Sequence, residues 1–363
     1  MDNRYIIFGL HELEGVGWKT ILQLLSRFPE PQELFELSTE ALHAAGIRKS
    51  IADLIAKRFS PSFIEERLQL YEQQSIHILT LLDDGYPPIL KEIAQPPWIL
   101  FFKGDPSFLN QSLLSIVGTR TPTPYGKKIA ENLAMELSQA GFGIVSGLAR
   151  GIDSQAHIGA LQGTSGTVAV LGCAINQIYP RENALLYRKI EQQGVILSEY
   201  PIGTKLHPGM FPQRNRIIAG LSLGVMVVEA APDSGSLITV EFALDESRDV
   251  FAVPGSIHSS QSGGVHNLLK QGAKLVSNVH DVLEEYPYLL RSGQIAVPHR
   301  YVKLLDLSVE EQQIMAIMSN EPMSIDTLLE VSQFTFGHLH AVLLSLLMKK
   351  AIKQLPGSTY LLA

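Results

Sequence analysis

Two arginines and an asparagine occupy consecutive positions, Arg214, Asn215 and Arg216, shortly after Phe211 and Pro212. Proline suits the first turn of an α-helix, so the polar triplet is predicted to lie in the opening turns of a helix. Cations near the positive end of a helix dipole are disfavoured unless an anion lies between the cations and the free N–H groups of the helix. The triplet is therefore interpreted as one half of a phosphate-binding site. The alternative is a pair of arginines that bridge acidic side chains elsewhere in the fold.

Three glycine-containing loops could supply the rest of such a site. They are Gly118-Thr119-Arg120, the segment Ser146–His157 with Gly147 and Arg150, and Ser234-Gly235-Ser236. Each follows an apolar run and precedes a helical pattern, so its backbone N–H groups could approach a phosphate. The first loop lacks both the G-x-G-x-x-G spacing and a Walker A lysine, which argues against a dinucleotide site and a P-loop.

Other candidate groups favour structural roles. Asp153 and His157 are four residues apart and could form an acid–base pair, but a helix cap beside a hydrogen-bonded histidine is the favoured interpretation. Cys173 is the single cysteine, and its place after an apolar run predicts a buried residue at a strand end. His338 and His340 would diverge on a helix, so we predict no metal site and no cofactor.

The composition is that of a globular protein. The 363 residues allow about two to three domains, with 45% apolar and 18% charged residues. No apolar run reaches membrane-spanning length and the first residues lack a signal pattern. We therefore expect a cytoplasmic protein that does not bind a membrane. The net charge is −7, but residues 111–230 hold ten Lys and Arg against seven Asp and Glu. The basic character is therefore local.

Residues 66–287 are predicted to form one α/β domain. The expected strands are 76–81, 99–103, 114–117, 143–146, 167–171, 195–198, 225–229, 250–253 and 274–276. The expected helices between them are 126–140, 154–161, 184–193, 216–221, 237–246 and 266–271. Continuous apolar strands that alternate with helices are typical of a mostly parallel, doubly wound sheet covered on both faces. Ligands of such sheets bind at the carboxyl ends of the strands.

Smaller modules are expected at both ends. Residues 1–65 read as short helices, and the stretch Leu13–Thr20 with Gly15 and Gly17 has the pattern of a helix-hairpin-helix, with a weaker copy around Gly46. An ordinary helical packing module is an equal alternative, because few cations lie near these glycines. Residues 288–305 are predicted to be a linker.

Residues 306–363 have the order of a winged helix, with helices at 309–318, 325–331 and 336–350 and a hairpin of 351–355 and 359–362. The third helix lacks the Arg, Asn and Gln side chains that read bases. Partner binding or regulation is therefore at least as good an interpretation as DNA readout.

Several blocks together resemble the DNA-processing protein A family, also called Smf. They are Val117–Arg120, Ser146–His157, Glu199-Tyr200-Pro201 with Phe211–Ser222, Val228–Leu237 with Thr239, Val250–Gly255 and Asn267–Ala273. The resemblance implies an extended Rossmann-like core that binds single-stranded DNA in natural transformation, forms a homodimer and loads a RecA-type recombinase. It implies a non-enzymatic protein with no catalytic residue.

The resemblance and the loops together predict a set of DNA contacts. They are Gly118, Thr119, Arg120, Gly147, Arg150, Lys205, Phe211, Arg214, Asn215, Arg216, Ser234, Gly235 and Ser236. Glycine amides and arginines would hold successive phosphates, and Phe211 would stack on a base, which suits a strand bound without sequence preference. Replacement of Arg120 or Arg216 by alanine is expected to abolish binding while the fold persists.

Two other functions stay open. Related sheets occur in nucleoside-monophosphate phosphoribohydrolases, and Ser234–Glu241 occupies the place of their catalytic loop, but its glycines and the spacing to Glu241 depart from that pattern. A transcription factor that acts through the terminal domains is the third reading, which the weakly basic third helix of the winged helix disfavours.

Overall fold

The computed structural model describes residues 1–295, 308–318, 322–349, 351–355, 357 and 359–362. These residues form two compact units, one that holds the described residues up to 295 and one that holds those from 308 onwards. No helix in these described ranges is both long and apolar enough to cross a membrane.

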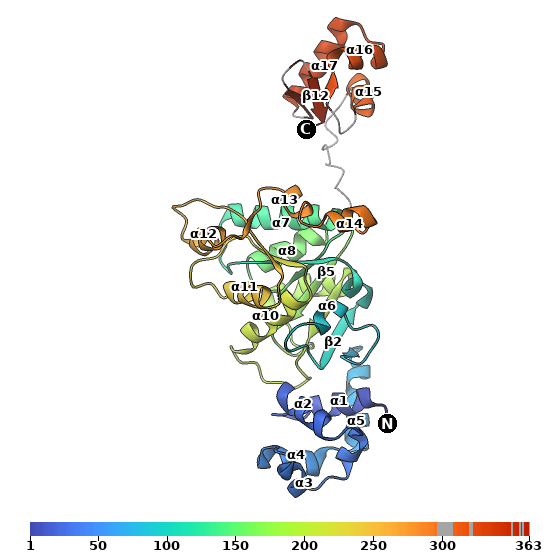
Figure 1. Ribbon diagram of the computed structural model, residues 1–363, viewed down its shortest axis with the longest axis vertical. Helices are drawn as coiled ribbons and strands as arrows, with labels where there is room; N and C mark the ends of the chain where they lie inside the picture. Colours follow the sequence, from blue (N-terminus) through green and yellow to red (C-terminus); the bar gives the residue numbers. More distant parts are fainter. Residues whose placement is uncertain (296–307, 319–321, 350, 356, 358, 363) are drawn as a thin grey trace. The chain divides into compact units, whose positions relative to one another are not determined.

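Five helices open the first unit (blue in Figure 1). They are α1 (Asn3–His11), α2 (Trp18–Arg27), α3 (Thr39–Ala44), α4 (Lys49–Arg58) and α5 (Pro61–Gln73). Gly15 and Gly46 have positive φ values of 85° and 91° in the turns of two helix hairpins, α1–α2 and α3–α4. Only glycine adopts this conformation without strain, which is why the pattern of the sequence predicted both turns.

Nine strands form the central sheet, in the order β1-β2-β6-β5-β4-β3-β7-β8-β9. The strands are β1 (His77–Thr80), β2 (Ile99–Gly104), β3 (Leu113–Val117), β4 (Gly143–Ser146), β5 (Thr167–Leu171), β6 (Val195–Ser198), β7 (Gly224–Val227), β8 (Asp249–Ala252) and β9 (Lys274–Leu275). All neighbours from β6 to β9 run parallel, whereas β2 is antiparallel to both β6 and β1. Every residue of β3, β4, β5, β6 and β7 is buried, as expected for strands covered on both faces.

Helices cover both faces of the sheet (Figure 1). One face carries α7 (Pro124–Gln139), α8 (Ile152–Ala160), α9 (Ala184–Gln193), α13 (His280–Leu283), α14 (Pro287–Ser292) and the N-terminal helices. The other face carries α6 (Pro88–Lys91), α10 (Met210–Gly220), α11 (Leu237–Asp245) and α12 (Gly263–Lys270). Short 3-10 helices occupy Pro31–Phe35, Pro106–Asn110, Arg181–Asn183 and Ser260–Ser262. The doubly wound, mostly parallel α/β fold predicted from the sequence is confirmed.

Three predicted boundaries were wrong. The domain limit at residue 65 falls inside α5, because Tyr71 of this helix stacks on Phe101 of β2, with ring centroids 4.7 Å apart. The first residues of the predicted linker form a helix, α14, which packs on the core of the sheet through the buried side chain of Leu289. Helix α10 begins at Met210 and not at residue 216, which adds a turn and a half before Arg216. Residues 296–305 of the predicted linker, and the first two residues of the predicted winged-helix domain, lie outside the described residues.

The second unit is a winged helix. It contains α15 (Val309–Ile317), β10 (Met323–Ser324), α16 (Ile325–Ser332), α17 (Phe336–Met348), β11 (Ile352–Leu355) and β12 (Thr359–Leu362), with the strands in the order β10-β12-β11. Phe336 and Leu344 of α17 are more than half exposed, and neither α16 nor α17 contains a lysine or arginine. The third helix therefore offers no cation to a phosphate.

Candidate nucleic-acid interface

The carboxyl ends of β3 and β7 meet where the chain changes its direction of travel across the sheet. After β3 the chain continues through β4, β5 and β6 on one side, and it then returns past β3 to β7, β8 and β9 on the other. Doubly wound sheets bind ligands at such a switch point. Helices α8, α10 and α11 all begin at this edge, so the positive ends of three helix dipoles lie around it.

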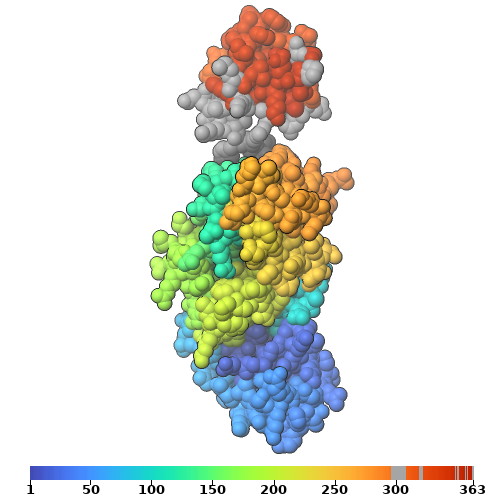
Figure 2. Space-filling model, turned by 90° about the vertical axis from the view of Figure 1, so that its left-hand side faces the viewer, coloured from blue at the N-terminus to red at the C-terminus, as the bar shows by residue number. Residues whose placement is uncertain are grey.

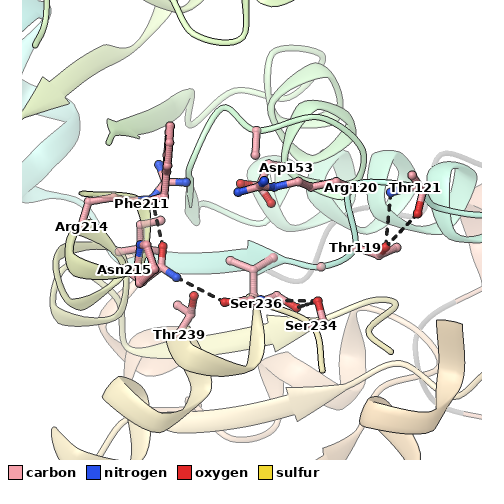
Figure 3. A pocket seen from close by; sticks show the side chains of 16 residues that line it. Thr119, Arg120, Thr121, Asp153, Phe211, Arg214, Asn215, Ser234, Ser236 and Thr239 are labelled. Carbon is pink, nitrogen blue, oxygen red and sulfur yellow. Dashed lines mark hydrogen bonds between the residues drawn. The ribbon is translucent and has the colours of Figure 1, made fainter. Parts of the chain in front are cut away.

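A cavity of about 330 Å³ lies at this edge (Figure 3). The three predicted loops and the start of α10 all contribute to its wall. Its polar and aromatic lining consists of Thr119, Arg120, Thr121, Asp153, Phe211, Arg214, Asn215, Ser234, Ser236 and Thr239, together with Gly118 and Gly235. In Figure 3 the side chains of Arg120 and Arg214 extend towards one another from opposite sides of the cavity. The structure therefore brings the three predicted loops together at one edge of the sheet.

Arg214 is the buried cation of the cavity. Its side chain donates hydrogen bonds from Nη1 to the carbonyl oxygens of Gly147, at 2.7 Å, and of Val170. Its Nε donates to Oδ1 of Asn215 at 2.9 Å, and Asn215 in turn donates to the carbonyl of Gly235 at 3.4 Å. Burial lowers the pKa of Arg214, but a guanidinium stays charged in proteins. The side chain is thus a fixed positive charge that ties the Gly147 loop to β5 and, through Asn215, to the Gly235 loop.

Arg216 lies outside the cavity wall. It is two residues after Arg214, about 200° around the helix axis, so it points away from its neighbour. Its Nη2 donates to both carboxylate oxygens of Glu199 at 2.5 Å, and its Nη1 donates to the carbonyl of Gln95 at 2.8 Å. Both side chains of this ion pair are only 10% exposed. The prediction that Arg216 contacts DNA is therefore corrected, because a buried carboxylate already neutralises it.

Phe211 is half-buried, and its ring is already in contact on several sides. The guanidinium carbon of Arg120 lies 5.8 Å from the ring centroid, and an added Cβ on Gly172 would come within 2.6 Å of the ring. The ring of Tyr179 lies 5.2 Å away at 38°. The stacking role predicted for Phe211 therefore requires Arg120 to share the ring face with a base or to move aside.

Tyr179 was missed by the sequence analysis. Its side chain is 44% exposed, and it lines a second cavity, of about 30 Å³, with Arg120, Arg150 and Phe211. The sequence could have indicated it, because Tyr179 lies in the loop after β5, and this loop emerges at the same edge of the sheet. Tyr179 adds an exposed aromatic surface beside Phe211.

Arg150 and Lys205 lie at the periphery. Arg150 lines the second cavity and forms an exposed ion pair with Glu182, with Nη2 and Oε2 2.8 Å apart. Lys205 is exposed in the loop before α10 and lines neither cavity. Its contact with DNA remains a prediction.

Asp153 shapes the second loop. It is the second residue of α8, whose N-cap is Gly151, so it is not the cap that the sequence predicted. Its carboxylate accepts a hydrogen bond from the N–H of Gly147 at 3.1 Å. Burial raises the pKa of Asp153, and the charge of Arg214 opposes that shift. Asp153 thus places a buried carboxyl group beside the arginines and anchors the Gly147 backbone.

His157 is buried and neutral. Its Nδ1 lies 2.7 Å from Oγ1 of Thr167, which donates its own proton to the carbonyl of Ile144. Nδ1 must therefore carry the imidazole proton, and Nε2 accepts from the N–H of Leu148 at 3.3 Å. Burial lowers the pKa of His157 to about 3. These contacts make His157 a structural support of the loop, but its partners are Thr167 and Leu148 and not Asp153.

Two glycines of the site differ in what surrounds them. A Cβ on Gly147 would overlap the guanidinium of Arg214, so this position is filled by the protein itself. A Cβ on Gly235 would meet no heavy atom within 4 Å. Gly235 therefore leaves open space through which a ligand backbone could approach the start of α11.

The candidate catalytic carboxylate of the enzymatic alternative lies away from the cavity. Glu241, the candidate of the phosphoribohydrolase alternative, is exposed on α11 and does not line the cavity. Among the residues that the structure describes, no group of three His, Cys, Asp or Glu could hold a metal ion. Cys173 is buried, as predicted, and burial raises the pKa of its thiol to about 11.

The fold is that of a Rossmann-like protein with arginines around a cavity at one edge of its sheet and with a winged-helix domain. A family model described as "DNA recombination-mediator protein A" matches residues 77–287, and a model described as "DprA winged helix domain" matches residues 302–358. The chain belongs to the DNA processing protein A family.

Named relatives agree with this assignment. The chain is 34% identical to Protein Smf of Synechocystis over 96% of each chain. It is 40% identical to DNA processing protein DprA of Bacillus subtilis, over 69% of this chain and 83% of that protein.

Solved structures of the family share the fold. DNA processing protein A of Streptococcus pneumoniae is 38% identical and matches with a TM-score of 0.68 over 78% of this chain and 97% of that one. The protein from Helicobacter pylori, whose structure is described as showing a single-stranded DNA binding mode, is 32% identical, with a TM-score of 0.53 over 58% of this chain and 96% of that one.

Proposed function

We propose that this protein binds single-stranded DNA without sequence preference, through the cavity at the carboxyl ends of β3 and β7. The observation that carries the proposal is the convergence of Arg120 and Arg214 beside the open backbone of Gly235 and the rings of Phe211 and Tyr179. Cations and exposed backbone suit phosphates, whereas aromatic rings suit unpaired bases of any kind. The relative from Helicobacter pylori supports the same ligand.

The partners follow from family membership. We propose that the protein is not an enzyme and acts in the cytoplasm in natural transformation, where it protects incoming single strands and loads a RecA-type recombinase on them. We also propose a homodimer. Leu275 of the edge strand β9 is 48% exposed, and Leu244 of α11, which lines a cavity together with Lys274 of β9, is 61% exposed. These two side chains support an apolar contact surface there. Sedimentation of Leu244→Arg against wild type tests this surface, and an unchanged mass would exclude it.

A matched pair of variants tests the binding site. Arg120→Ala removes an exposed cavity cation, whereas Arg188→Ala removes an exposed cation of α9 that lines neither cavity. Both side chains are exposed, so both variants should fold. In a titration with a fluorescent oligo-dT, Arg120→Ala is expected to lose binding and Arg188→Ala to keep it. Equal affinities of the two variants would reject the site.

The enzymatic alternative is tested separately. Incubation with AMP, followed by detection of free adenine, should give no turnover. Among the described residues that line the cavity, the carboxyl group is that of Asp153, which is buried and bonded to the N–H of Gly147. Turnover that disappears in Glu241→Gln would establish the alternative function.

A further inference from the structure

The loop between β6 and α10, residues 199–209, is attached to the N-terminal helices. His11 of α1 lies with Nε2 2.7 Å from the carbonyl oxygen of Glu199. The N–H of Ile202 donates to the hydroxyl of Tyr71 at 2.8 Å, and Nη2 of Arg67 donates to the carbonyl of Ile202 at 3.0 Å. Both polar backbone groups of Ile202 are therefore held by side chains of α5.

A single buried carboxylate orients both of these side chains. The hydroxyl of Tyr71 donates to Oε1 of Glu12, and Nε of Arg67 donates to Oε2, each at 2.5 Å. The Glu12 side chain is completely buried. Because the proton of the Tyr71 hydroxyl points to Glu12, an oxygen lone pair is left to accept from Ile202. Charge-assisted bonds of this kind are short and directional, so the group is a rigid clamp.

Beyond the clamp, most of the loop is exposed, and the buried Met210 closes it at the start of α10. Gly203 and residues 205–209 are exposed, and Lys205 is among them. The loop leads directly into the first turn of α10, which carries Phe211 and, one turn later, Arg214. In Figure 2 the yellow-green surface of this region borders the blue N-terminal helices.

Outside the clamp, Nε2 of Gln177 donates to the carbonyl of Thr204 at 3.3 Å, and the hydroxyl of Tyr200 donates to the carbonyl of Met210 at 3.1 Å. A segment with so few bonds to the rest of the fold depends strongly on each of them.

We propose that Glu12, Arg67 and Tyr71 are positioning residues for strand binding: they hold Ile202, and through it the course of residues 203–209 and the start of α10. This inference rests on the proposed function. It gives the N-terminal helices a role that does not require any contact with DNA, since neither α1 nor α5 contributes to the two cavities.

Tyr71→Phe tests the clamp in the full chain. It removes only the hydroxyl and keeps the ring that stacks on Phe101. We expect about a three- to tenfold loss of affinity for oligo-dT, the size of one net hydrogen bond. Amide hydrogen exchange of residues 199–209 should accelerate in the same variant, while exchange in β3–β7 stays as in wild type.

Ser138→Ala is the matched control. The Ser138 hydroxyl is also buried and also donates one hydrogen bond, to Ala160, and accepts one, from Ser165, but it lies on α7 outside both cavities. A comparable loss of unfolding free energy is expected, with unchanged DNA affinity. Arg67→Lys is the second test, because it keeps a cation beside Glu12 but shortens the reach to Ile202, and it should reproduce the Tyr71→Phe result.

The outcomes separate this inference from the proposed function. If wild type fails to bind oligo-dT, the proposed function is wrong. If wild type binds and Tyr71→Phe and Arg67→Lys bind equally well, or if exchange of residues 199–209 is unchanged in them, the positioning role is excluded. Equal loss of affinity in Ser138→Ala would also exclude it, because loss of stability alone would then explain the effect.

Discussion

Arg214 and Arg216 are two residues apart on α10, yet only Arg214 faces the cavity, whereas Arg216 is sealed in an ion pair with Glu199. One motif thus combines a ligand-facing cation with a structural one. Arg216 fixes the loop that precedes α10, because its partner Glu199 is the first residue of that loop after β6.

Replacement of Arg216 should affect stability before it affects binding. Arg216→Met leaves the carboxylate of Glu199 buried without its partner, which costs about 3–5 kcal/mol of unfolding free energy. Urea denaturation measures the loss, and the double variant Arg216→Met with Glu199→Gln should recover most of it, because the unpaired charge is gone. Wild-type stability with abolished DNA binding in Arg216→Met would contradict this role and restore a direct contact.

Two glycine replacements should both weaken DNA binding but differ in their effect on stability. Gly235→Ala meets open space, so the unfolding free energy should stay within about 0.5 kcal/mol of wild type, while affinity for oligo-dT falls because the methyl group occupies the approach of the DNA backbone. Gly147→Ala overlaps Arg214 and should lower both stability and affinity. Thermal unfolding together with oligo-dT titration separates the two, and normal binding by Gly235→Ala would mean that DNA does not approach this backbone.

The buried histidine should make the fold sensitive to acid. The pKa of His157 is lowered to about 3 from its ordinary 6.5, so the unfolded chain binds a proton between these values and the folded chain does not. Stability is therefore complete above pH 6.5 and falls as the pH drops below it, by about 2 kcal/mol at pH 5. Urea denaturation at pH 7 and pH 5 should show this loss in wild type and a smaller one in His157→Gln. An identical loss in the variant would assign the acid sensitivity to other groups.

Tyr179 should contribute to binding through its ring. Loss of a base stack in Tyr179→Ala should weaken single-strand binding by about 1–3 kcal/mol, whereas Tyr179→Phe keeps the ring and should bind like wild type. Anisotropy titrations of the two variants make the comparison. If both variants bound with the same affinity, the ring of Tyr179 would not contribute to the binding of bases.

The sheet and the location of the site could be predicted from the sequence because both depend on local patterns. Strands β3 to β7 are buried on both faces and so appear as unbroken apolar runs, and loops after parallel strands must meet at one edge. The partner of Arg216 could not be predicted, since Glu199 is 17 residues away and nothing local pairs the two charges. The clamp around Glu12 could not be predicted for the same reason, because its partners Arg67 and Tyr71 lie more than fifty residues further along the chain.

The central claim is that cavity cations grip an unpaired strand by its phosphates, and a salt series tests it most directly. Fluorescence anisotropy with single- and double-stranded oligonucleotides of mixed sequence would be recorded between about 50 and 200 mM salt, for wild type and Arg120→Ala. We predict tighter binding of the single strand, an affinity that falls steeply with salt, and a logarithmic slope shallower by about 0.7 in the variant, for one lost phosphate contact. Equal affinity for both oligonucleotides, or the same affinity and slope in the variant as in wild type, would contradict the account.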